Sequence, residues 1–90
     1  MNIELTLIGK PGCHLCEDAQ AAISRVVGSF ETANPSVTIS MVEKNILADA
    51  ELAARYAEEI PVLLINGKVH NYWRIDEVRF ADALSNLVEG

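Results

Sequence analysis

The chain has 90 residues, half of them hydrophobic, and carries a formal net charge of −6. This length suffices for one small domain, residues 1–90, and leaves no room for a second. Its seven Lys and Arg residues are spread along the chain, so neither nucleic acid nor an anionic membrane surface is an expected partner.

The N-terminal third of the sequence predicts a strand followed by a helix. Residues Ile3–Ile8 alternate between apolar and polar before turning apolar, which is typical of a strand. Gly9-Lys10-Pro11-Gly12 ends the strand. From Cys13 onward the apolar residues recur every three or four positions and predict an amphipathic helix of about four turns; they are Ala19, Ile23, Val26, Val27 and Phe30.

The middle of the chain predicts a second strand and a second helix. After a turn at residues 34–36, Val37–Val42 alternates cleanly and predicts a strand with one buried face. A helix is expected from about Leu47 to Glu59, because its alanines have high helix propensity. Its apolar face is expected to consist of Leu47, Leu52 and Tyr56.

The C-terminal third predicts a hairpin and a last helix. Val62–Ile65 is continuously apolar, as in a strand covered on both faces, and Asn66-Gly67 favours a tight turn into an antiparallel strand, Lys68–Trp73. One of the two rings that end this strand, Tyr72 or Trp73, is expected in the core. Asp76 is the expected N-cap of a helix whose buried stripe is Phe80, Leu84 and Leu87.

The predicted order is therefore βαβαββα. A right-handed crossover in the first βαβ unit makes its two strands parallel. We expect an α/β domain with a four-stranded mixed sheet flanked by three helices, two on one face and one on the other.

The only two cysteines, Cys13 and Cys16, lie at the junction of the first strand and the first helix. Positions i and i+3 of a helical turn place their Cβ atoms ~5–6 Å apart, close enough for a disulfide after modest adjustment. As a structural crosslink the disulfide would stabilise the fold only slightly, because closing so short a loop removes only about 2 kcal/mol of unfolded-chain entropy. The pair is therefore a candidate redox centre or metal ligand, with two small buried hydrophobic residues as the alternative.

The two thiols are expected to differ in reactivity. Cys13 falls at the start of the helix, where free N–H groups and the helix dipole favour a thiolate, whereas Cys16 lies one turn further in. Our hypothesis is that Cys13 attacks a substrate disulfide and that Cys16 resolves the mixed disulfide. Lys10 and His14 would stabilise the thiolate, while Glu17 and Asp18 would oppose it.

The sequence also indicates a compartment. The N-terminal residues lack a basic segment and an uninterrupted apolar segment, so no signal peptide is predicted. No apolar run approaches the ~20 residues of a membrane span. We therefore expect a cytoplasmic protein, and in the cytoplasm a C-x-x-C pair is more often redox-active or metal-binding than structural.

The run from Lys10 to Cys16, Lys-Pro-Gly-Cys-His-Leu-Cys, together with Ile60-Pro61, resembles the glutaredoxin and thioredoxin families across essentially the whole chain. It looks most similar to small bacterial glutaredoxin-like proteins with a C-x-L-C-E active-site run. The resemblance implies a thioredoxin-like fold, Cys13 as nucleophile, Cys16 as resolving thiol and a cis peptide bond before Pro61. Ile60 would then offer its backbone N–H and C=O groups to an extended substrate segment.

The same resemblance suggests reaction partners. Arg74 can meet a carboxylate of glutathione and Asp76 its amine, although a solvated charge and a helix cap are equally good explanations of the two residues. We expect no bound cofactor, glutathione as a candidate co-substrate, a small or protein disulfide as substrate, and an external thiol as reductant. The protein is expected to be a monomer.

Two other functions remain open. A C-x-x-C pair can hold a soft ion such as Cu(I) or Zn(II). With only two thiols and two distant histidines, His14 and His70, a closed four-ligand zinc site within one chain is not expected, and we predict no metal site. Alternatively, the chain is an interaction module that keeps the fold without turnover, since Glu17 and Asp18 lie beside the pair.

Overall fold

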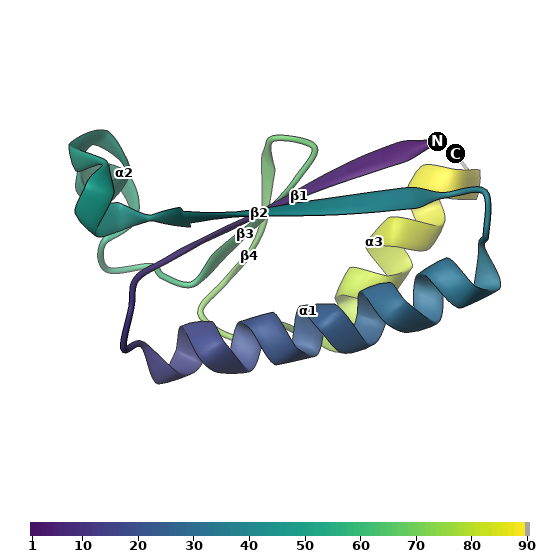
Figure 1. Ribbon diagram of the computed structural model, residues 1–90, viewed down its shortest axis with the longest axis horizontal. Helices are drawn as coiled ribbons and strands as arrows, with labels where there is room; N and C mark the ends of the chain where they lie inside the picture. Colours follow the sequence, from purple (N-terminus) through teal and green to yellow (C-terminus); the bar gives the residue numbers. More distant parts are fainter. Residues whose placement is uncertain (90) are drawn as a thin grey trace.

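A computed structural model describes residues 1–89 and has the predicted order of elements (Figure 1). The elements are β1 (Asn2–Gly9), α1 (His14–Ala33), β2 (Thr38–Asn45), a 3₁₀ helix (Ile46–Ala48), α2 (Ala50–Tyr56), β3 (Val62–Ile65), β4 (Lys68–Tyr72) and α3 (Glu77–Glu89). None of the helices in residues 1–89 is both long and apolar enough to cross a membrane.

The four strands form one mixed sheet in the order β2-β1-β3-β4. β1 and β2 are parallel, as the crossover rule predicts, and β3 is antiparallel to both β1 and β4. The register of the parallel pair places Gly9 beside Asn45. The carboxyl ends of β1 and β2 therefore lie next to each other, at the edge of the sheet where α1 begins.

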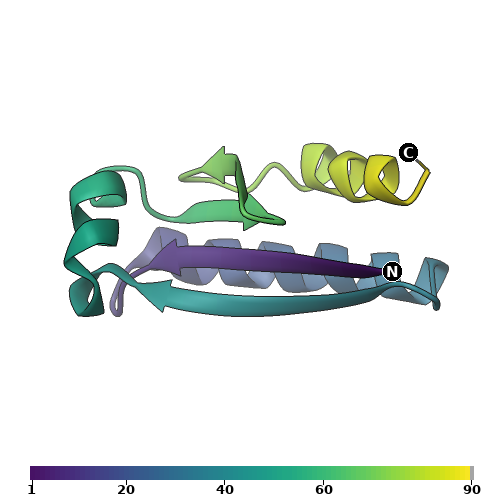
Figure 2. The ribbon, with the colours of Figure 1, turned by 90° about the horizontal axis from the view of Figure 1, so that it is seen from above.

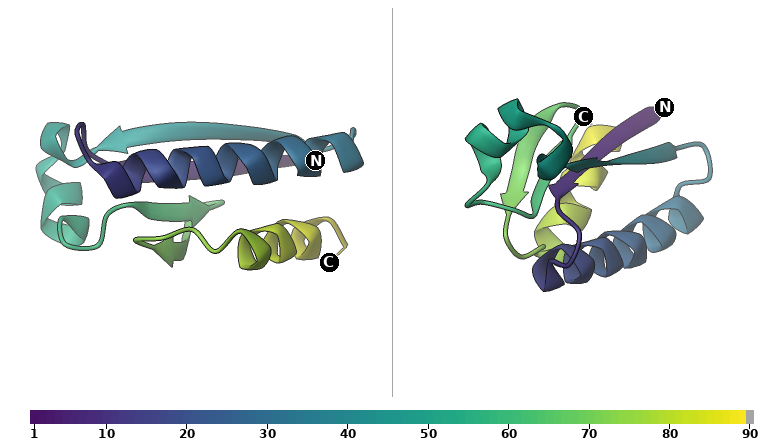
Figure 3. Two further views of the ribbon diagram at one scale, coloured as in Figure 1. Left: turned by 90° about the horizontal axis from the view of Figure 1, so that it is seen from below. Right: turned by 60° about the vertical axis from the view of Figure 1, so that its left-hand side comes forward.

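The main core lies between the sheet and the two long helices. α1 and α3 cover the same face of the sheet, as the view from below shows (Figure 3). Side chains from β1, β3 and both helices fill this layer, and Phe80 and Leu84 are fully buried in it. The apolar stripes of the first and last helices thus confirm the predicted packing.

A smaller core lies at the other side of the sheet, under α2. Its buried members are Ile8, Ile46, Ile60 and Val62. Ile8 points away from Leu7 of the main core because successive side chains of a strand alternate between faces. α2 is short and sits at one end of the sheet (Figures 1 and 2), so most of this face is not covered by a helix.

The predicted helix from Leu47 to Glu59 is too long at both ends, because α2 spans only Ala50–Tyr56. A side-chain oxygen of Asp49 accepts hydrogen bonds from the backbone N–H groups of Glu51 and Leu52, at 3.0 and 3.1 Å. This is N-cap geometry, and aspartate is more favourable as a cap than inside a helix. α2 therefore begins after Asp49, and Leu47, expected on the apolar face, is 73% exposed in the preceding 3₁₀ helix.

The hairpin and the last helix begin as predicted. Asn66 and Gly67 both have positive φ, 51° and 82°, which is the conformation that their tight turn requires. At the start of α3, Asp76 Oδ1 accepts a hydrogen bond from the backbone N–H of Arg79 at 3.1 Å. Asp76 is therefore the N-cap that the sequence predicts.

The expectation that Tyr72 or Trp73 packs in the core is wrong. Tyr72 is 39% exposed and Trp73 is 53% exposed. β4 ends at Tyr72, and Trp73, at φ 59°, turns the chain out of the sheet while its indole N–H donates to the carbonyl of Glu58. Because β4 is an edge strand, these residues lie at the margin of the sheet and are covered only in part.

His70 on β4 is a half-buried histidine that favours its neutral form. Its ring lies 6.0 Å from the ring of Phe80, and its buried Nε2 has no hydrogen-bond partner within residues 1–89. Burial, and secondarily the charge of Arg79, lower the pKa of His70 below its ordinary value of 6.5, while Asp76 opposes the change.

We expect His70 to make the protein less stable in mild acid. In the unfolded chain His70 takes up a proton near pH 6.5, whereas in the folded chain it does so only at lower pH. The contribution of neutral His70 to folding stability is therefore complete above the pKa of the unfolded state and is lost as the pH falls below it. Urea unfolding at about pH 7.5 and about pH 5.5 measures the loss. His70→Gln is the control: it should lose less stability than the wild type over this interval, and an equal loss would contradict the prediction.

Candidate active site

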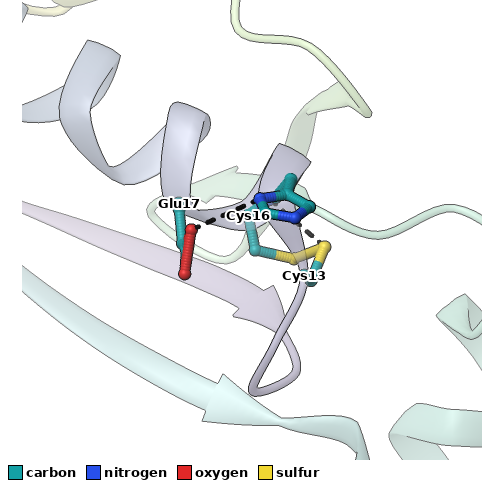
Figure 4. Close-up of a disulfide and its surroundings, with 4 residues drawn as sticks. Cys13, Cys16 and Glu17 are labelled. Carbon is teal, nitrogen blue, oxygen red and sulfur yellow. Dashed lines mark hydrogen bonds and ion pairs between the residues drawn. A yellow bond between two sulfur atoms is a disulfide. The ribbon is translucent and has the colours of Figure 1, made fainter.

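The loop between β1 and α1 presents both cysteines at the first turn of α1. Gly12 has φ +73°, a conformation that costs glycine little, and it leads the chain into the extended residue Cys13, the N-cap of α1. Cys13 and Cys16 form a disulfide with their Cα atoms 5.2 Å apart (Figure 4). The spacing of the two residues thus brings the sulfurs together as predicted.

The Cys13 sulfur takes the place of the usual capping oxygen. The backbone N–H of Cys16 donates to Cys13 Sγ at 3.2 Å. An N-cap side chain normally supplies an oxygen to this donor, and the positive end of the helix dipole lies at the same point. The first turn of α1 is therefore arranged to stabilise negative charge on Cys13 Sγ rather than on Cys16 Sγ.

The cysteines are partly buried and pack against the smaller core. Ile60 and Val62 of this core flank Pro61, whose side chain is fully buried. The Ile60–Pro61 peptide bond is cis, and the Pro61 carbonyl accepts a hydrogen bond from the backbone N–H of Trp73 at 2.8 Å. The fold thus brings Ile60-Pro61 to the cysteine pair, although they are separated by more than forty residues in the sequence.

The charged side chains near the pair differ in their placement. His14 is 95% exposed, and its Nδ1 lies 3.8 Å from Glu17 Oε2, so the glutamate offsets any positive charge on the imidazole. Lys10 is exposed in the loop before Cys13. Asp18 is also exposed, in the first turns of α1.

Arg74 lies in the loop between β4 and α3, and Asp76 is the last residue of that loop before α3 begins. Arg74 is exposed. Asp76 is held on both sides, because its side chain caps α3 and its backbone N–H donates to Asn71 Oδ1 at 3.1 Å. The helix-cap explanation therefore accounts for Asp76, and a role for either residue in binding glutathione stays a prediction.

A cavity of about 390 Å³ opens beside Cys16. It lies at the adjacent carboxyl ends of β1 and β2, against the first turns of α1. Its walls are Leu7, Gly9, Lys10, Pro11, Gly12, Cys16, Glu17, Gln20, Glu43, Lys44 and Asn45. Sequence reasoning missed the wall from β2, although the predicted parallel pairing of the two strands was a signal that their ends meet.

Gly9 leaves room for the disulfide. A Cβ added to Gly9 would lie 2.8 Å from Cys16 Sγ and 3.3 Å from Cys16 Cβ, closer than side chains pack. Because the sulfur is held in the disulfide, it cannot swing away as the end of a free side chain would.

We therefore expect Gly9→Ala to destabilise the oxidised protein by about 1–3 kcal/mol, the usual cost of overpacking. Urea unfolding of the oxidised variant measures the change. Gly28→Ala is the matched control: Gly28 lies in α1 with nothing within 4 Å of an added Cβ, and the same substitution there should stabilise the protein by about 0.5–1 kcal/mol. An oxidised Gly9→Ala protein as stable as the wild type would contradict the prediction.

Within residues 1–89, no three His, Cys, Asp or Glu side chains are clustered as ligands of one ion. Any soft ion would therefore have to be held by the two thiols alone or with ligands from outside the described chain.

Known proteins similar to this chain share its fold. A solved structural-genomics target from X. campestris is 26% identical, with a TM-score of 0.70 over 91% of this chain and 96% of that chain. A protein from Nitrosomonas europaea is 22% identical, with a TM-score of 0.61 over 90% and 89% of the two chains. A mutant thioredoxin from Halobacterium salinarum is 16% identical, with a TM-score of 0.58 over 93% and 73%. The fold is therefore thioredoxin-like, as predicted.

Sequence comparisons identify the family. An uncharacterised protein of Mycobacterium tuberculosis is 26% identical over 76 residues, which cover 84% of this chain and 76% of the relative. Residues 4–85 match the family model described as Glutaredoxin-like domain (DUF836). The chain, with its Cys13–Cys16 pair at the start of α1, belongs to this glutaredoxin-like family.

Proposed function

We propose that the protein is a thiol–disulfide oxidoreductase in which Cys13 is the nucleophile and Cys16 the resolving thiol. The observation that carries the proposal is the hydrogen bond from the backbone N–H of Cys16 to Cys13 Sγ at the N-terminus of a 20-residue helix. This donor and the helix dipole favour a thiolate on Cys13, and the thiolate is the nucleophile in disulfide exchange.

The reaction runs through two exchange steps. The Cys13 thiolate attacks one sulfur of a substrate disulfide, forming a mixed disulfide and releasing the other sulfur as a thiolate. The Cys16 thiolate then attacks Cys13 Sγ and releases the second substrate thiolate. The substrate is reduced by two electrons, and the protein is left with the Cys13–Cys16 disulfide that the structure contains. Two equivalents of an external thiol restore the dithiol without a bound cofactor.

An extended substrate segment has a backbone partner beside the pair. Within residues 1–89, the N–H and C=O of Ile60 form no hydrogen bond with another backbone group, and Ile60 packs in the same small core as the cysteines. A peptide strand laid along Ile60 can use both groups, as in other strand-addition complexes. The proposal therefore includes protein disulfides as well as small ones as substrates. It also includes that the protein acts as a monomer in the cytoplasm.

The experiment that tests the function is a redox titration of the Cys13–Cys16 pair against the glutathione and dithiothreitol couples. We expect a reversible two-electron transition in both couples. Thiol alkylation and mass spectrometry measure the fraction of reduced protein at each point. A glutathione adduct on Cys13 would support glutathione as the electron donor, with Arg74 as the first side chain to test for its carboxylate. A pair that stays oxidised or stays reduced across the titration would contradict the proposed function.

Metal content distinguishes the proposed function from its main alternative, which is the binding of a soft metal ion by the two thiols. Protein purified without oxygen keeps both thiols free, so a soft-metal site would retain one ion per chain under these conditions. The proposed function predicts substoichiometric metal and full reactivity of both thiols toward an alkylating reagent. A stoichiometric ion that protects both thiols would favour metal binding instead.

A further inference from the structure

Trp73 is an exposed aromatic residue beside the Ile60-Pro61 segment. Its backbone N–H donates to the Pro61 carbonyl at 2.8 Å, and its indole N–H donates to the Glu58 carbonyl at 3.1 Å. Trp73 is therefore tied to the chain on both sides of Ile60. We propose that Trp73 is a specificity-determining residue that packs against an apolar side chain of a polypeptide substrate bound along Ile60. The inference rests on the proposed function and specifies its substrate class.

The backbone conformation of Trp73 is the first argument. Its φ of 59° lies in the left-handed region, which glycine adopts at little cost and bulky residues rarely adopt. Residues held in such conformations cluster at binding and active sites. The side chain is 53% exposed, and of the two cores formed by residues 1–89 it belongs to neither. A large ring in a glycine-type conformation, half of it facing solvent, indicates that the ring serves binding rather than core packing.

The order of the indole ring is the second argument. The hydrogen bond to the Glu58 carbonyl fixes the direction of the ring, and the ring of Tyr72 lies next to it, with centroids 6.1 Å apart. A side chain that is already ordered loses little conformational entropy when a partner binds. Tryptophan and tyrosine are also the residues that most often dominate the binding energy of protein interfaces. Tyr72 and Trp73 together are therefore a preorganised apolar contact surface.

The neighbouring backbone specifies the occupant. In the described part of the chain, the N–H and C=O of Ile60 have no backbone partner, so an extended peptide can pair with them. In strand addition, the backbone groups give affinity and the side chains give specificity. Residues of a strand follow each other at about 3.3 Å, so a ring beside Ile60 is within reach of side chains one or two positions from the paired residue. The preferred substrate is therefore a protein disulfide with an apolar residue close to the cysteine that Cys13 attacks.

The direct test observes Trp73 in a trapped complex. Two peptides that differ only in leucine or serine beside their cysteine carry thionitrobenzoate on that sulfur. The Cys13 thiolate of reduced Cys16→Ser protein attacks the peptide sulfur and releases thionitrobenzoate, which leaves a stable mixed disulfide. Because Trp73 is the only tryptophan of the chain, its fluorescence reports on this one side chain.

We expect the emission maximum of the leucine adduct to lie at shorter wavelength than that of the serine adduct, since the leucine side chain removes water from the indole ring. Identical emission spectra in the two adducts would overturn the inference while leaving the proposed function intact. If neither peptide forms an adduct on Cys13, the proposed function itself is contradicted.

Variants of Trp73 test the same contact by kinetics. The measured quantity is the ratio of kcat/KM for a leucine-containing peptide disulfide to kcat/KM for hydroxyethyl disulfide, which has no side chain to offer. We expect Trp73→Ala to lower this ratio by about tenfold, mainly through KM of the peptide, as truncation of an interface aromatic does. A purely structural role of Trp73 would lower both rates and leave the ratio unchanged, which would overturn the inference.

Two further variants separate the ring from its hydrogen bond and from general surface apolarity. Trp73→Phe keeps an aromatic ring without the indole N–H and should retain most of the ratio; a ratio as low as that of Trp73→Ala would assign the effect to the hydrogen bond and overturn the inference. Val69→Ala is the matched control, because Val69 is an exposed apolar residue of the same strand that pairs with Leu64 near the hairpin turn. It should leave the ratio unchanged, and a loss equal to that of Trp73→Ala would also overturn the inference.

Discussion

Replacement of Cys13 by serine is expected to lower the rate of disulfide reduction by about three orders of magnitude or more, since it removes the nucleophile itself. A serine hydroxyl at this position is not ionised at neutral pH, and the capping N–H of Cys16 cannot make it a comparable nucleophile. The measurement is the rate at which the reduced protein consumes a small disulfide, and the release of the product thiol reports this rate.

Cys16→Ser is the matched variant, because it removes the other sulfur of the same turn. Its Cys13 thiolate can still attack the substrate, so we expect a mixed disulfide on Cys13 to accumulate when no reductant is present. Intact-protein mass spectrometry detects the adduct. If the wild type and Cys13→Ser reduce the disulfide at the same negligible rate, Cys13 has no part in turnover and the chain is better explained as an interaction module with a thioredoxin-like fold.

Phe80→Ala is expected to destabilise the protein by about 3–5 kcal/mol, the usual effect of removing a large aromatic side chain from a core. Phe80 is fully buried, the largest of the fully buried side chains, and lies in the layer where α3 meets the sheet. A domain of this size has a free energy of unfolding of about 5–15 kcal/mol, so the loss is a large share of the total. Urea denaturation followed by circular dichroism measures it.

Val78→Ala on the same helix is the control for Phe80→Ala. Val78 is 73% exposed, two residues before Phe80, so its truncation removes no core contact. We expect a change within about 0.5 kcal/mol. A Phe80→Ala protein that unfolds at the same urea concentration as the control would contradict the assignment of Phe80 to the centre of the core.

Several elements were predictable because their signals are local. The turn at Asn66-Gly67 needs two residues that tolerate positive φ, and the start of α3 needs an oxygen that accepts from the backbone N–H of Arg79; both requirements are met by residues within the turn itself. The apolar periods of α1 and β1 likewise predicted which side chains face the main core, because each period is a property of one segment.

The errors arose where a local pattern competed with another interaction. The alanines after Leu47 predicted one continuous helix, but the side chain of Asp49 stabilises a break within it. The rings of Tyr72 and Trp73 have the size and apolarity of core residues, yet they lie at the end of the edge strand β4, where both residues stay exposed. Propensity describes what a segment prefers, and it contains no information on what packs against that segment.

The sequence by itself determined the chemistry of the site: two thiols three residues apart, a strand before them and a helix after them, which set the disulfide and the capping of Cys13. Only the tertiary structure decided what surrounds the two sulfurs. Ile60-Pro61 lies beside the pair, and Glu43, Lys44 and Asn45 wall a cavity on the side of Cys16. The reason is physical: spacing along a helix is fixed by its backbone geometry, whereas neighbours from β2 and β3 depend on how strands far apart in the chain pair.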